Sequence, residues 1–90
     1  MKIDDVLREL ESVAEKRQVR LSYESLGGDS GSGGLCKVKG EYRIIIDKRA
    51  TPGERVTILA QALAGFPLDD LFIPEEVREL IARTAAFRRA

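Results

Sequence analysis

The segment Tyr42-Arg43-Ile44-Ile45-Ile46-Asp47, followed closely by Thr51-Pro52-Gly53-Glu54-Arg55, decides the fold. The first segment is rich in β-branched residues, and its alternate side chains share one face, which is typical of a strand. The second segment is a strong helix start. Thr51 is a capping residue, proline follows at the first helical position, and Glu54 completes a capping box. The sequence therefore predicts a strand that leads almost directly into a helix.

Apolar residues cover most of the circumference of this predicted helix. One face carries Val56, Leu59, Ala60, Leu63 and Ala64, and a second carries Ile58, Ala62 and Gly65. A helix that is apolar nearly all round packs against neighbours on more than one side. We expect it to be central in the fold and to end at Gly65 and Pro67.

The residues before residue 42 predict one helix and two further strands. Residues 3–17 have the apolar spacing of an amphipathic helix, and residues 19–23 alternate like a half-buried strand. Residues 35–39 and 42–47 predict a hairpin whose turn is Lys39-Gly40-Glu41, because Gly40 tolerates a positive φ. We expect Cys36 and Val38 to point together toward the core.

A last helix begins at Pro74, with Val77, Leu80, Ile81 and Ala85 on its buried side. The fold class predicted is α+β, in the order α-β-β-β-α-α, with a small, three-stranded, mostly antiparallel sheet packed against helices. We expect residues 1–90 to form a single domain with a frayed tail at 86–90.

Residues 25–34 read SLGGDSGSGG, a composition that predicts a flexible loop. The loop is also a candidate binding loop through Gly28, Asp29, Ser30, Gly31, Gly33 and Gly34. It does not match a P-loop, because Lys37 stands three positions after Gly34 and the loop leads into a strand. The string at 28–31, GDSG, occurs around the nucleophile of trypsin-like proteases, but a serine needs a base and this chain has no histidine.

Composition excludes several classes of function. The absence of histidine removes the usual general base and every histidine-dependent zinc site. Fifteen basic residues balance fifteen acidic ones, so wholesale attraction to nucleic acid or to an anionic membrane is not expected. A single cysteine rules out an internal disulfide, and no apolar run approaches a signal peptide or a membrane span. We expect a cytoplasmic protein without membrane contact.

The remaining reactive side chains have simpler structural interpretations. Cys36 is interpreted as a small core residue, because it lies on the apolar face of its predicted strand and the neighbouring Lys37 faces the other way. The carboxylates Asp69 and Asp70 suit a loop, and Glu75 and Glu76 suit the first turn of a helix. An all-carboxylate set drawn from Asp29, Asp47, Asp69 and Asp70 would favour a harder ion than zinc. We expect no metal and no cofactor.

The element order, together with the segments at 42–47 and 51–65, resembles the core of minimal zincins. It is most similar to the ImmA/IrrE-type bacterial metallopeptidases, whose third strand leads into the helix that carries HExxH. The resemblance covers roughly residues 3–66 in architecture and hydrophobic pattern. It does not extend to the functional residues, because Gln61, Ala62 and Gly65 occupy the positions of the first histidine, the glutamate and the second histidine. The resemblance thus implies a catalytically dead peptidase-like fold.

The preferred interpretation is a non-enzymatic binding domain that engages another protein. Two alternatives remain open. One is an unusual small enzyme that uses Cys36 or a carboxylate near the glycine loop. The other is a nucleic-acid-associated accessory protein that uses the tail arginines Arg83, Arg88 and Arg89, which a continuous basic face joining the tail to Lys37, Lys39 and Arg43 would favour.

Overall fold

The structure, a computed structural model, describes residues 1–27 and 33–89. Its elements are α1 (Ile3–Lys16), β1 (Arg20–Glu24), β2 (Gly33–Val38), β3 (Glu41–Asp47), α2 (Pro52–Leu63) and α3 (Glu75–Arg89). The predicted α+β class and the predicted order of elements are confirmed. In this part of the chain, no helix is long and apolar enough to cross a bilayer.

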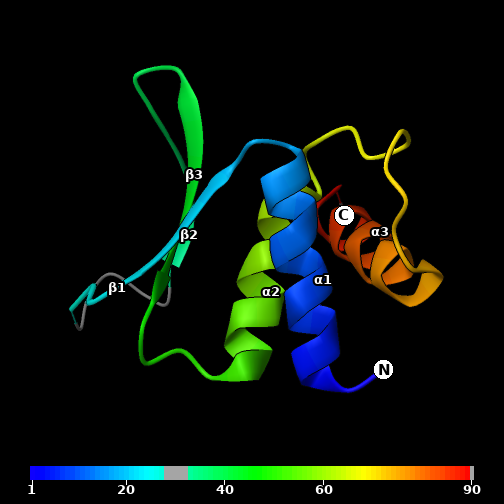
Figure 1. The fold of residues 1–90 in the computed structure, drawn as a ribbon, viewed down its shortest axis with the longest axis horizontal. Helices are drawn as coiled ribbons and strands as arrows, with labels where there is room; N and C mark the ends of the chain where they lie inside the picture. The colour runs from blue at the N-terminus through cyan, green and yellow to red at the C-terminus, as the bar shows by residue number, and fades with distance from the viewer. Residues whose placement is uncertain (28–32, 90) are drawn as a thin grey trace.

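The elements form three layers (Figure 1). The sheet is one layer, α1 and α2 lie side by side against one of its faces, and α3 packs on their far side. The buried side chains come from every layer, and those with no exposed surface include Leu10, Ile44, Ile46, Leu59 and Leu63. The prediction that the second helix is central is confirmed, since α2 contacts α1, α3, β2 and β3.

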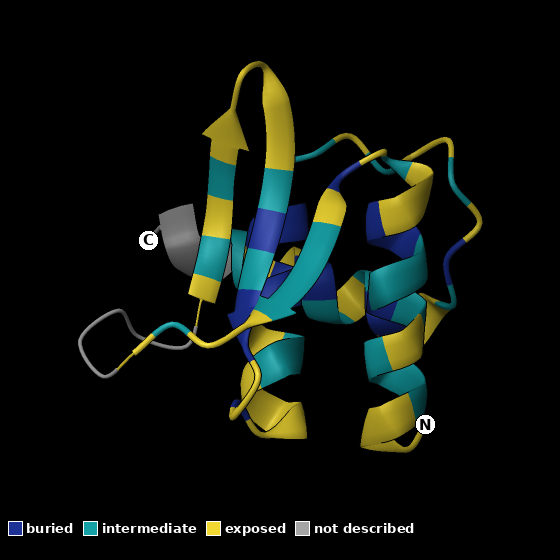
Figure 2. Ribbon diagram, turned by 60° about the vertical axis from the view of Figure 1, so that its left-hand side comes forward, coloured by how far each residue is buried: buried dark blue, intermediate teal, exposed yellow. Residues whose placement is uncertain are grey.

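The sheet is mixed, with strand order β1-β3-β2. β1 pairs with β3 in parallel, and β2 pairs with β3 antiparallel. The antiparallel prediction therefore holds for the hairpin of β2 and β3. β1 pairs with the other edge of β3 and runs parallel to it. As the central strand, β3 is the most buried of the three (Figure 2).

The hairpin turn fixes which side chains of β2 face the helices. Val38 pairs with Glu41, so the loop is the two residues Lys39 and Gly40, both of which have positive φ (52° and 83°). Such a turn matches the twist of the flanking strands. The prediction that Gly40 takes a positive φ is confirmed.

The prediction that Cys36 and Val38 face the core is wrong. Cys36 pairs with Arg43, whereas Leu35 pairs with Ile44, which is fully buried beneath the helices. Cross-strand partners share a face, so Cys36 and Val38 lie on the sheet face that points away from the helices. Cys36 is half-buried there and Val38 is 40% exposed. The buried residues of β3 set this phase, and the short apolar pattern of β2 gives no sign of it.

Four of the helix ends follow local signals. The capping box of α2 is complete, since Glu54 N donates to Thr51 Oγ1 at 3.2 Å and Thr51 N donates to Glu54 Oε1 at 2.9 Å. α1 begins with acidic residues and ends with Lys16, as the helix dipole favours. α3 begins one residue after Pro74, and Val77 and Ile81 are on its buried side as predicted.

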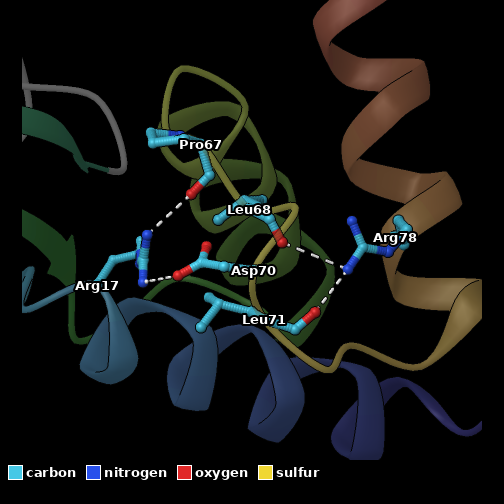
Figure 3. A network of polar contacts seen from close by, with 6 residues as sticks. All are labelled: Arg17, Pro67, Leu68, Asp70, Leu71 and Arg78. Carbon is cyan, nitrogen blue, oxygen red and sulfur yellow. Dashed lines mark hydrogen bonds and ion pairs between the residues drawn. The ribbon is translucent and has the colours of Figure 1, made fainter.

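Two arginines hold the segment between α2 and α3 (Figure 3). Arg17, at the end of α1, donates to the Pro67 carbonyl at 3.2 Å and pairs with Asp70 at 2.8 Å. Arg78, on α3, donates to the Leu71 carbonyl at 2.7 Å. The segment is thus fixed from both sides by charge-assisted hydrogen bonds, which are stronger than neutral ones.

Candidate binding groove

A groove of about 420 Å³ lies between the edge strand β2 and helix α2. Its lining comprises Gly33, Gly34 and Leu35 from β2, and Ile58, Gln61 and Ala62 from α2. Leu35 is 40% exposed although it lies on the helix side of the sheet. The groove therefore presents apolar side chains at the margin of the core.

Gly33 sets the position of β2 at this groove. Its φ is +135°, and a Cβ built on it would lie 2.0 Å from the Ile45 carbonyl oxygen and 2.8 Å from the Ile46 Cα. No side chain fits there, so glycine allows the start of β2 to approach β3 closely. Gly34 has no such constraint, since nothing lies within 4 Å of its built Cβ.

The outer edge of β2 is open along the described chain. β3 occupies the inner edge, and no described strand pairs with the outer one. An open edge presents backbone N–H and C=O groups that can pair with an added strand. In Figure 2, β2 is one of the two outer strands of the sheet and has no buried residue.

The structure brings together two groups of residues that the sequence suggested separately. Gly33 and Gly34, from the predicted binding loop, belong to β2 and lie across the groove from Gln61 and Ala62. The prediction that the loop extends to residue 34 is wrong at its last two positions, because both pair with β3. Gly28, Asp29, Ser30 and Gly31 lie outside the described residues.

The three positions that replace the metallopeptidase motif have different surroundings. Gln61 is exposed and lines the groove, whereas Ala62 is only 5% exposed. Gly65 is exposed beyond the end of α2, and its built Cβ meets nothing within 4 Å. Neither Gln61 nor Gly65 is therefore buried against α1.

Among the described residues, the lining of the groove contains no cysteine and no carboxylate. In the described residues, no group of three or more metal-ligating side chains could hold a metal ion. Cys36 lies on the opposite face of the sheet from Leu35. Asp47, a carboxylate close to the loop, is 7% exposed and accepts a hydrogen bond from Arg49 N at 2.9 Å, which is a turn-stabilising contact. Cys36 and Asp47 are therefore not part of the groove lining.

The other predicted ligand groups are dispersed. Asp70 pairs with Arg17, and Glu76 pairs with the amino terminus at 3.0 Å. Of the tail arginines, Arg83 is exposed on α3. The side chains of Arg88 and Arg89 lie outside the described part of the structure. Lys37 pairs with Tyr42 and Cys36 pairs with Arg43, so Lys37 and Arg43 point to opposite faces. They do not form the continuous basic face that a nucleic-acid surface would need.

A larger cavity of about 660 Å³, which the sequence did not suggest, lies beyond the start of β1. Its charged lining residues are Glu15, Arg17, Arg20 and Glu41. Tyr42 also lines the cavity, and its ring packs edge-on against the ring of Phe66. The lining mixes both signs of charge, and the terminal nitrogens of Arg17 are already engaged by Pro67 and Asp70. The cavity therefore offers no convergent set of groups for one class of ligand.

Tyr23 is the titratable residue with the most altered environment in the described chain. Burial and a hydrogen bond to Glu11 raise the pKa of Tyr23 to about 12. The Arg55 guanidinium lies 4.7 Å from the centre of its ring and partly opposes the increase. A phenol that holds its proton so firmly is a poor general base near neutral pH. Tyr23 instead joins β1 to α1 and α2.

Comparison of this chain with protein family models, with curated proteins and with solved structures found no match.

Proposed function

We propose that the protein is a non-enzymatic binding domain that receives an extended segment of another protein along the open edge of β2. The observation that carries the proposal is the coincidence of that edge with the groove lined by Leu35, Ile58 and Ala62. Backbone hydrogen bonds between β2 and the segment would supply affinity. The groove would accept alternate side chains of the segment and so supply specificity, as is usual in strand addition.

The resemblance to zincins that have lost the HExxH motif suggests how such a binding domain could have arisen from a peptidase. A peptidase fold that has Gln61, Ala62 and Gly65 in place of its motif retains the surface that holds a peptide and lacks the groups that cut it. The position of Gln61 in the groove supports this interpretation. The argument from the edge and the groove does not depend on it.

The proposal is tested by selecting displayed random peptides of about twelve residues on the immobilised protein. Binders are then mapped by amide NMR shifts and by hydrogen exchange. We expect shifts at residues 33–38, 58, 61 and 62, together with slower exchange of outward-facing β2 amides, because they gain hydrogen bonds. Binders that leave β2 unaffected, or a failure to select any binder, would contradict the proposal.

Leu35→Lys is the matched variant for this site, and Val38→Lys is its control. Both residues are 40% exposed on β2, so either lysine can reach water with little loss of stability. Leu35 lines the groove, whereas Val38 is on the opposite face next to the turn. We expect Leu35→Lys to weaken peptide binding about tenfold or more, and Val38→Lys to have a small effect.

A further inference from the structure

We infer that Arg20 and Arg43 form a binding site for the phosphate group of a phosphorylated protein segment, on the sheet face that points away from the helices. The two residues are direct partners in the parallel pairing of β1 and β3. Leu21 and Ile44, the next pair, face the helices, so Arg20 and Arg43 both project from the other face. The site is separate from the groove, which lies on the helix side.

Two like charges placed directly opposite one another on neighbouring strands destabilise a sheet. In the described residues neither guanidinium has a hydrogen bond or an ion pair that would offset this repulsion directly, although Glu15 and Glu41 line the same cavity as Arg20. The Nε atom of Arg43 is buried and has no hydrogen-bond partner in that part of the chain. An anion that bridges the two side chains would relieve both conditions.

The arginines that hold the fold together behave differently. Arg55 donates to the Ala50 and Lys48 carbonyls at 3.0 Å, and Arg78 donates to the Leu71 carbonyl. The Nε of Arg17 is also buried without a hydrogen-bond partner in the described chain, but its terminal nitrogens are engaged by a carbonyl and a carboxylate. The structural arginines of this chain are therefore used by the chain itself, and the Arg20–Arg43 pair is available for a ligand.

The shape and chemistry of the site select the class of ligand. Guanidinium groups match the oxygens of a phosphate in paired hydrogen bonds. The site lies on an open sheet face, flanked by the half-buried Ile45 and Cys36, so a free anion would have few other contacts. A phosphate carried by a protein segment would gain contacts with those apolar neighbours as well.

The surrounding charges argue against a polyanion. Glu24 and Glu41 lie on the same face as the arginine pair, Glu24 four residues after Arg20 and Glu41 two residues before Arg43. A nucleic acid or an anionic membrane would extend over both carboxylates, whereas a single phosphate bridging the two arginines covers a smaller area. One phosphorylated side chain therefore fits the charge pattern best.

The test uses the full chain and follows the Nε–Hε NMR signals of its arginines. The probes are inorganic phosphate, an otherwise neutral six-residue peptide with one phosphoserine, and the same peptide without phosphate. We expect both phosphate probes to shift the signals of Arg20 and Arg43 in a saturable manner. The phosphopeptide should bind more tightly than inorganic phosphate, and the unmodified peptide should cause no shift.

Arg43→Gln should weaken phosphopeptide binding about tenfold or more, because a charge-assisted hydrogen bond is lost. Arg83→Gln, which changes an exposed arginine on α3, is the control and should leave binding unchanged. Without phosphate, Arg43→Gln should raise the melting temperature, because it removes the repulsion with Arg20. A lower melting temperature would indicate a structural role and would overturn the inference.

Three further outcomes would also overturn it. Shifts of the same size at Arg83 would indicate nonspecific ion binding. Equal affinity for inorganic phosphate and the phosphopeptide would show that no protein segment is recognised. Tighter binding of a duplex DNA, an RNA or a vesicle containing phosphatidylserine than of the phosphopeptide would assign the arginines to a polyanion.

Discussion

Replacing Gly33 by alanine tests the claim that close approach of backbones at the start of β2 builds the groove. The built Cβ would lie 2.0 Å from the Ile45 carbonyl oxygen, and the φ of +135° is one that side chains rarely allow. Strain of this kind costs about 1–3 kcal/mol, and displacement of packed neighbours costs a similar amount. We expect Gly33→Ala to lower the free energy of unfolding by about 2–4 kcal/mol.

This loss is large compared with the stability of a small domain. A chain of 90 residues has a free energy of unfolding of roughly 5–13 kcal/mol. The measurement is urea unfolding followed by far-ultraviolet circular dichroism, with the midpoint and the slope fitted separately. A shifted midpoint with an unchanged slope would show that stability changed without a change in the surface exposed on unfolding.

Gly34→Ala is the neighbouring control. Its built Cβ meets nothing within 4 Å, and its backbone lies outside the positive-φ region. Alanine there removes freedom from the unfolded chain, so we expect a change between zero and a gain of about 1 kcal/mol. Equal destabilisation by the two substitutions would refute the reasoning, since only Gly33 is in close contact with β3.

Three other predictions concern the core, the segment between α2 and α3, and the half-buried Tyr23. Phe72→Ala should change the free energy of unfolding by less than about 0.5 kcal/mol, because Phe72 is 90% exposed, whereas Ile73→Ala, at 7% exposed, should cost about 2–4 kcal/mol in the same urea assay. Arg78→Met should cost about 1–3 kcal/mol, because the Leu71 carbonyl loses its donor, and exchange of amides in residues 64–74 should accelerate. In a Tyr42→Phe background, absorbance at alkaline pH should show the remaining tyrosine titrating near pH 12. Its pKa is raised in the folded state, so its contribution to stability is complete below about pH 10 and is lost as the pH rises through about 12, a loss that Tyr23→Phe should remove.

Local signals in the sequence predicted the elements well where one short segment contains the whole signal. The Thr51–Glu54 capping box, the positive φ at Gly40 and the apolar circumference of α2 each follow from neighbouring residues. The parallel pairing of β1 with β3 has no such signal, because it depends on how α1 and β1 approach the hairpin. The sequence therefore predicted the order of the elements more fully than the arrangement of the strands.

The groove, like the strand pairing, could not be predicted from local signals in the sequence. Its two sides come from residues 33–35 and 58–62, which are separated by β3 and the turn into α2. Gly33 and Gly34 continue a run of glycine and serine, so composition assigned them to a loop. Their place in β2 depends on contact with Ile45 and Ile46, which only the folded chain provides. Cys36 was placed on the wrong face for the same reason, since register is a property of the pair of strands.

The two proposed sites are compatible with a single bound segment, because one row of residues connects them. Arg20, Arg43 and Cys36 lie side by side across β1, β3 and β2. A strand added to the edge of β2 would lie about 4.8 Å beyond it, so its residue opposite Cys36 would continue that row. Cys36 has a small side chain, which leaves space above it for a phosphorylated residue on the added strand to meet the Arg43 guanidinium. Residues of the segment opposite Leu35 would instead enter the groove, because alternate side chains point to opposite faces. An extended ligand would therefore carry its phosphate one position away from the apolar residue that fills the groove.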